Sequence, residues 1–157
     1  MSPTPTAVAD TSALQYLFQL GHLDLLRHLY MRVLVPRAVE RELEIGRRDG
    51  RNVPVVASIA WLEVISVSNP LLHLDPGEAE VIAAAQQRGI LAVLDDRAAR
   101  RAAEALGVAV TGTLGILIEG KRRGLIPAVE PEFDRLVTLG FRLTPATRRM
   151  ALELAGE

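Results

Sequence analysis

Short apolar runs alternate along the chain with longer segments in which apolar residues recur every three or four positions. The short runs are typical of strands that are covered on both faces. They span residues 7–9, 33–35, 62–67, 90–94 and 108–110. This alternation predicts an α/β fold with a central parallel sheet of about five strands.

The segments with helical periodicity lie between these strands and continue after the last one. They span residues 12–29 (with a break expected at Gly21), 37–47, 77–88, 97–106, 114–123, 131–139 and 145–154. We therefore expect a single domain over residues 1–157, with a core over 1–125 and a helical extension over 126–157.

Composition narrows the choice of function. The 157 residues are 49% hydrophobic and 24% charged, as expected for one soluble domain. Lys and Arg number 18 and Asp and Glu 19, so the net charge of −1 excludes a strongly basic nucleic-acid coat. The absence of cysteine excludes disulfides, thiol nucleophiles, iron–sulfur clusters and cysteine zinc sites.

The beginning of the chain indicates where the protein acts. The first ten residues contain no Lys or Arg, which a signal peptide would need, and no run approaches the ~18 apolar residues of a membrane span. We expect a cytoplasmic protein without a membrane partner.

Carboxylates follow two of the predicted strands at the points where these strands end. Asp10 comes directly after residues 7–9, and Asp95 and Asp96 come directly after residues 90–94. Ligands bind beyond the carboxyl ends of strands in open α/β sheets. Helix capping explains either site taken alone, but two adjacent aspartates are more than one cap requires.

Two glutamates fall on the apolar stripes of predicted helices. Glu42 shares the stripe of residues 37–47, and Glu78 aligns with Val81 and Ile82. Simpler interpretations exist for both. Glu42 could lie at a rim with its carboxylate in solvent, and Glu78 could close a capping box that begins at Asp75.

These acids indicate a function only when they are considered together. Two unit charges 4 Å apart repel by about 4 kcal/mol at an effective dielectric constant near 20, and four carboxylates form six pairs. Such a cluster must take up protons or bind a cation, and oxygen ligands select Mg²⁺ or Mn²⁺. Either ion can promote hydrolysis of a phosphodiester. We therefore predict four catalytic carboxylates, namely Asp10, Glu42, Glu78 and Asp96, with Asp95 as an alternative metal ligand.

The sequence resembles the PIN-domain family, metal-dependent ribonucleases that include the VapC-like toxins of bacterial toxin–antitoxin pairs. The resemblance runs over nearly the whole chain and is carried by five segments. They are Val8-Ala9-Asp10-Thr11-Ser12, the helix around Glu42, Gly77-Glu78-Ala79, and Leu94-Asp95-Asp96-Arg97 with the later Val110-Thr111-Gly112-Thr113. The last pair resembles a longer, poorly characterised PIN-like branch. The sequence departs from the family at Glu78, where most members carry Asp, and at Leu94, where the toxins often have Thr.

The resemblance implies a three-layer α/β/α fold with extra C-terminal helices. It also implies one or two Mg²⁺ or Mn²⁺ ions in the crevice and a water or phosphate oriented by Thr11 or Ser12. The implied protein is an endoribonuclease and the toxin partner of a small antitoxin. A catalytically inactive PIN-like binding or assembly module is the alternative, and a receiver-like phosphoacceptor is a weaker one. The surplus C-terminal helices favour a homodimer.

An RNA partner needs local positive charge. Residues 97–123 contain six Lys or Arg and two Glu, a local charge of +4. Arg97 and Arg100 follow Asp96 closely, so we expect them to contact RNA, although solvated helix faces would have the same composition. Thr113, from the branch motif, is a further candidate substrate ligand.

Overall fold

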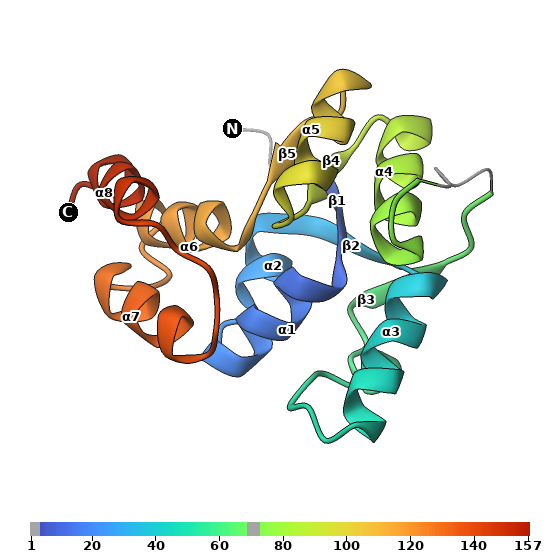
Figure 1. Cartoon of the computed structure of the whole chain (residues 1–157), viewed down its shortest axis with the longest axis horizontal. Coiled ribbons are helices and arrows are strands. Elements are labelled where there is room, and N and C mark those ends of the chain that lie inside the picture. The colour runs from blue at the N-terminus through green and yellow to red at the C-terminus, as the bar shows by residue number, and fades with distance from the viewer. Residues whose placement is uncertain (1–3, 69–72) are drawn as a thin grey trace.

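Five strands form one parallel sheet in the order β3-β2-β1-β4-β5 in the computed structural model, which describes residues 4–68 and 73–157 (Figure 1). The strands are β1 (Thr4–Ala9), β2 (Tyr30–Pro36), β3 (Leu62–Ile65), β4 (Leu91–Val93) and β5 (Val110–Thr111). Each neighbouring pair is parallel. The predicted parallel sheet of about five strands is confirmed.

In the described parts of the chain, eight helices connect and follow these strands. They are α1 (Thr11–Leu20), α2 (Leu25–Leu29), α3 (Arg37–Arg48), α4 (Pro76–Arg88), α5 (Arg97–Ala105), α6 (Thr113–Arg122), α7 (Glu130–Thr138) and α8 (Pro145–Leu154). A 3-10 turn covers Val56–Ser58. None of the helices in the described parts of the chain combines the length and apolarity needed to cross a membrane.

The predicted break at Gly21 is present, whereas several strand boundaries differ from the sequence prediction: β1 and β2 each begin three residues earlier than predicted, and β3 and β5 are shorter. The predicted helix over 12–29 breaks at Gly21, as expected, where a left-handed backbone with φ of 77° ends α1. Strand β3 ends at Ile65 rather than at residue 67, because its partner β2 ends opposite, at Pro36. The last strand begins at Val110 rather than at 108, because the N–H of Val108 still bonds the carbonyl of Ala103 at the end of α5.

Helices cover both faces of the sheet, which confirms the three-layer α/β/α class (Figure 1). Helix α4 contacts β1, β2 and β4, and α5 packs beside it. Helix α6 packs against both α1 and α2, and α2 also packs on β2. Both arrangements are expected for right-handed crossover connections. Such connections place their helices on one face of the sheet while successive strands are added in one direction, and on the opposite face once that direction reverses.

This reversal of direction determines where a crevice forms at the carboxyl ends of the strands. The chain travels from β1 to β2 in one direction and from β4 to β5 in the other, so β1 and β4 flank the switch point. In open parallel sheets this is where ligand crevices form. Asp10 directly follows β1, and Asp95 follows β4 after one residue.

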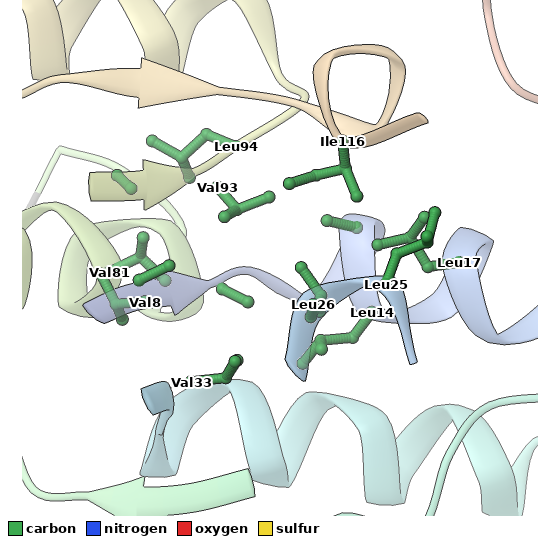
Figure 2. Close-up of a cluster of buried hydrophobic side chains, with 14 of the residues drawn as sticks. Val8, Leu14, Leu17, Leu25, Leu26, Val33, Val81, Val93, Leu94 and Ile116 are labelled. Atoms are coloured by element: carbon green, nitrogen blue, oxygen red, sulfur yellow. The ribbon is translucent and has the colours of Figure 1, made fainter. Parts of the chain in front are cut away.

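One continuous hydrophobic core fixes these strand ends. Figure 2 shows Leu14 and Leu17 of α1, Leu26 of α2 and the strand residues Val8 and Val93 among the side chains of this cluster. All five side chains are fully buried. Their burial makes α1 a rigid support for Thr11 and Ser12, which lie in its first turn.

The C-terminal extension shares this core. Val129, Phe133 and Leu136 are fully buried and belong to the same cluster as the strand residues. The Glu157 carboxylate accepts a hydrogen bond of 2.7 Å from the Val129 N–H and pairs with Lys121 at 2.9 Å. These contacts tie α6, α7 and the end of the chain together, so residues 126–157 pack as an integral part of the core.

The shared core predicts that Phe133→Ala lowers the free energy of unfolding by about 3–5 kcal/mol, because a buried ring is replaced by a cavity. Val137→Ala on the exposed side of the same helix is the matched control and should change it by less than about 0.5 kcal/mol. Urea unfolding followed by circular dichroism measures both. Equal effects of the two changes would mean that the extension does not contribute to the core.

Candidate active site

Asp10 lies at the centre of the candidate site. It follows the middle strand of the sheet, and its N–H bonds the carbonyl of Val93 on β4 at 3.1 Å. Its Oδ1 accepts a hydrogen bond of 2.7 Å from the N–H of Thr11, so it caps α1, as the simpler interpretation expected. The residue is 4% exposed.

Burial raises the pKa of Asp10 to about 8 from its ordinary value of 3.8. The Thr11 N–H acts in the opposite direction. The negative charges of Glu78, Glu42 and Asp95 raise the pKa further. Asp10 therefore lies where a negative charge is costly unless a positive charge comes with it.

Glu42 is held between two other elements. The hydroxyl of Thr11 donates a 2.5 Å hydrogen bond to its Oε1, and the N–H of Gly77 at the start of α4 donates a 3.0 Å bond to its Oε2. A Cβ at position 77 would lie 2.5 Å from Oε1, so only glycine permits this approach without moving the carboxylate. The carboxylate thus points toward the first turn of α1, and the rim interpretation of Glu42 is wrong.

Glu80 of α4 lies outside the predicted site and supports the start of α3, the helix that carries Glu42. Its Oε1 accepts a 3.1 Å hydrogen bond from the N–H of Ala38 in the first turn of α3. Pro36, which occupies the N-cap position of α3, has no side-chain acceptor to do so. In the sequence, Glu80 shares a helix face with Ala83 and Ala84, and this spacing indicates that its side chain faces the protein interior.

Glu78 lies half-buried on the first turn of α4. Burial raises its pKa to about 7, and the charges of Asp96, Asp75 and Glu42 raise it further, whereas the backbone N–H of Asp75 lowers it. That backbone interaction is one half of the expected capping box. The other half is missing, because the Asp75 side chain makes no capping hydrogen bond.

Asp95 is the most firmly held of the acids. Thr113 donates from its N–H to Oδ1 and from its hydroxyl to Oδ2, both at 2.7 Å, and the Ser12 hydroxyl donates to Oδ2 at 3.0 Å. A Cβ at Gly112 would lie 2.8 Å from Oδ1. Asp95 thereby joins β4 to the starts of α1 and α6.

Asp96 plays a different part from its neighbour. It is exposed, and its Oδ2 caps α5 by accepting a 2.9 Å hydrogen bond from the N–H of Ala99. The charge of Asp95 raises the pKa of Asp10, whereas the charge of Asp96 raises the pKa of Glu78. The two adjacent aspartates therefore serve different parts of the site.

A pocket of about 260 Å³ opens in front of Asp10. It is lined by Asp10, Thr11, Ser12, Gln15, Tyr16, Glu42, Asp75 and Glu78. Three predicted acids thus share one pocket, while Asp95 and Asp96 are not among the lining residues. The pocket also contains three residues outside the predicted site, namely Gln15, Tyr16 and Asp75. The first two continue the face of α1 that begins at Thr11 and Ser12, which was a usable signal.

The predicted substrate ligands divide into two groups. Thr11 and Ser12 line the pocket, and Arg97 is exposed just after Asp96. Arg100 instead donates a 2.9 Å hydrogen bond to the carbonyl of Leu94, which supports the segment before Asp95. The prediction for Thr113 is wrong, because its side chain is fully buried and its hydroxyl is used by Asp95.

The chemistry of these side chains fits a hard divalent cation. All the acids offer carboxylate oxygens, and burial disfavours the charge of Asp10 unless a cation compensates for it. Their spacing is not that of an assembled ligand set: within residues 4–68 and 73–157, no three His, Asp or Glu side chains are arranged to hold a metal ion. Glu42 and Asp95 instead bond donors of the protein itself.

Comparison with known proteins identifies the fold. A family model described as PIN domain matches residues 6–157. The chain belongs to the PIN-domain family. A solved PilT N-terminus domain protein from the hyperthermophilic archaeon Sulfolobus solfataricus P2 superposes with a TM-score of 0.56 at 19% identity, covering 73% of this chain and 92% of that one. No curated protein matches the chain.

Family membership confirms the resemblance that the motifs indicated. PIN domains are generally nucleases and typically bind divalent metal ions, and the chain has this nuclease-type fold. In this PIN domain the pocket lies at the carboxyl end of the sheet, beside the switch point between β1 and β4.

The raised pKa of Asp10 predicts a pH-dependent stability. Between pH 3.8 and about 8, folded Asp10 keeps a proton that the unfolded chain has lost, so stability falls as pH rises through this range. Asp10→Asn removes this effect and keeps the oxygen that accepts from Thr11. In a chelator, the variant should therefore be more stable than the wild type at pH 8, by about 1 kcal/mol or more.

Thermal unfolding at pH 4, 6 and 8 measures this difference, which should vanish near pH 4. Asp49→Asn, at an exposed residue after α3, is the control and should follow the wild type at every pH. A wild-type protein as stable as Asp10→Asn at pH 8 would show that Asp10 is not destabilised by its surroundings.

Proposed function

We propose that this PIN domain is an endoribonuclease that hydrolyses RNA phosphodiester bonds with Mg²⁺ or Mn²⁺. The observation that carries the proposal is the buried Asp10 carboxylate, which shares its pocket with Glu42 and Glu78. Pocket carboxylates whose pKa values are raised, as those of Asp10 and Glu78 are, cluster at functional sites.

Asp10, Glu42 and Glu78 would hold the ion, with Asp95 or Asp96 as the further acid. The ion would supply a Lewis acid for the phosphate and a water of lowered pKa. Asp10 and Glu78 have raised pKa values, so they must release protons before they act as ligands. Activity should accordingly increase with pH through the neutral range.

Hydroxyl groups and one arginine complete the proposed mechanism. Thr11 and Ser12 line the pocket, and each already orients a carboxylate through its hydroxyl. Their positions in the first turn of α1 let them orient a phosphate as well, because the N-terminus of a helix favours anions. Arg97 is exposed next to Asp96 and is available for a neighbouring phosphate of the RNA.

The test is cleavage of RNA by the purified protein with Mg²⁺ or Mn²⁺, together with calorimetric titration of Mn²⁺. Asp10→Asn should lower the cleavage rate by about 100-fold or more and weaken Mn²⁺ binding, because it removes a ligand charge at the centre of the site. Asp49→Asn removes one exposed carboxylate outside the pocket and should leave both measurements unchanged. Equal cleavage by wild type and Asp10→Asn would refute the proposal.

A non-catalytic binding or assembly module is the second candidate. It is favoured by the spacing of the acids, since no three of them in the described parts of the chain form an assembled ligand set. Titration distinguishes the two functions: the module binds no Mn²⁺ at millimolar concentration, whereas the nuclease does.

The toxin role is the finer part of the proposal and is supported by the motif resemblance. A toxin of this kind should arrest bacterial growth when it is expressed alone, and Asp10→Asn should relieve the arrest. Normal growth with the wild-type protein at the same expression level would count against it. The small antitoxin, the homodimer and the cytoplasmic location remain predictions.

A further inference from the structure

One wall of the pocket takes no part in holding the acids. It is formed by Gln15 and Tyr16, which lie one helical turn after Thr11 and Ser12 on α1. Both side chains are half-buried. Among the described residues, the amide of Gln15 has no hydrogen-bond partner, so its donor and acceptor are available to a ligand in the pocket.

The ring of Tyr16 is held in a defined orientation by the C-terminal extension. It meets the ring of Phe141 edge to face, with centroids 5.1 Å apart and planes at 83°. Phe141 lies between α7 and α8, where its N–H bonds the carbonyl of Leu136 at 2.9 Å, and it packs against the hydrophobic core. Such aromatic pairs are favourable beyond their buried area, so Tyr16 lines the pocket as a supported ring.

We propose that Tyr16 and Gln15 form a subsite for one unpaired nucleobase of the RNA substrate. The inference rests on the proposed function, because it concerns the nucleotide next to the phosphodiester that is cleaved. Tyr16 supplies an aromatic surface for stacking, and Gln15 supplies an amide that can bond the edge of the base.

Three physical arguments support the subsite. An aromatic side chain stacks on any base, so it can hold RNA without much sequence preference. The amide of glutamine both donates and accepts, as the edges of all four bases require. A base within a duplex has its faces stacked and its edge paired, so only an unpaired base can use both groups.

The subsite also complements the acids beside it. Carboxylates repel the phosphates of RNA, so contacts to the base are needed to hold the substrate where the charges oppose it. Tyr16 and the acids lie in the same pocket, so one nucleotide can meet both. Binding of the base therefore positions the adjacent phosphate.

The experiment measures binding of a fluorescently labelled single-stranded RNA in a chelator, where no metal-dependent cleavage occurs. Tyr16→Leu keeps an apolar side chain against Phe141 but loses the stacking surface, and should weaken binding by about 5- to 150-fold. Tyr16→Phe keeps the ring and should stay within about twofold of the wild type. Duplex RNA of the same sequence should bind equally to all three proteins.

Gln15→Ala should weaken binding of the single strand by about 2- to 10-fold. Gln19→Ala is its matched control on the same helix, because the Gln19 amide bonds the Asn52 carbonyl and does not line the pocket. This control should bind RNA like the wild type. Thermal unfolding of each variant verifies that it is folded.

Two results would overturn the subsite. One is single-strand binding that Tyr16→Leu leaves unchanged, and the other is a folded wild-type protein that binds no single-stranded RNA. Failure of the nuclease proposal gives a different pattern, in which RNA binding still depends on Tyr16 but neither the wild type nor Asp10→Asn cleaves. Cleavage that depends on Asp10 and is unaffected by Tyr16→Leu would leave the nuclease and remove the subsite.

Discussion

The burial of one carboxylate at the centre of the sheet is the constraint on which the site depends. Asp10 follows the middle strand, is nearly inaccessible to solvent, and accepts a hydrogen bond from the Thr11 N–H. A buried charge with so little compensation is costly, and the nearby acids increase the cost. The hydrophobic core overcomes it by fixing β1 and α1 on both sides of Asp10.

The other acids are placed by contacts between elements that are distant in the sequence. Glu42 bonds α1 and the start of α4, and Asp95 bonds the starts of α1 and α6. At each of these two junctions a glycine lets the backbone approach the carboxylate, Gly77 in the first case and Gly112 in the second. The groups that donate hydrogen bonds to these carboxylates also connect the helices to one another and to the sheet. The site therefore forms as the chain folds.

The C-terminal extension connects this site to the rest of the molecule. Its buried residues Phe133 and Leu136 belong to the common core, and its Phe141 supports the Tyr16 ring at the pocket wall. The helical extension therefore supports the pocket wall, a role that does not depend on the predicted homodimer. A segment that follows the last strand contributes to the site without supplying a single acid.

The sequence by itself determined the alternation of strands and helices, the break at Gly21, the extension and the acids at the strand ends. These features depend on local periodicity and on residues next to one another, which a single sequence displays directly. Tertiary structure alone decided the contacts that anchor Asp95, the burial of Thr113, and the support that Glu80 gives to α3. Which donor meets which carboxylate depends on packing between elements 18 to 83 residues apart, and local patterns do not encode that distance.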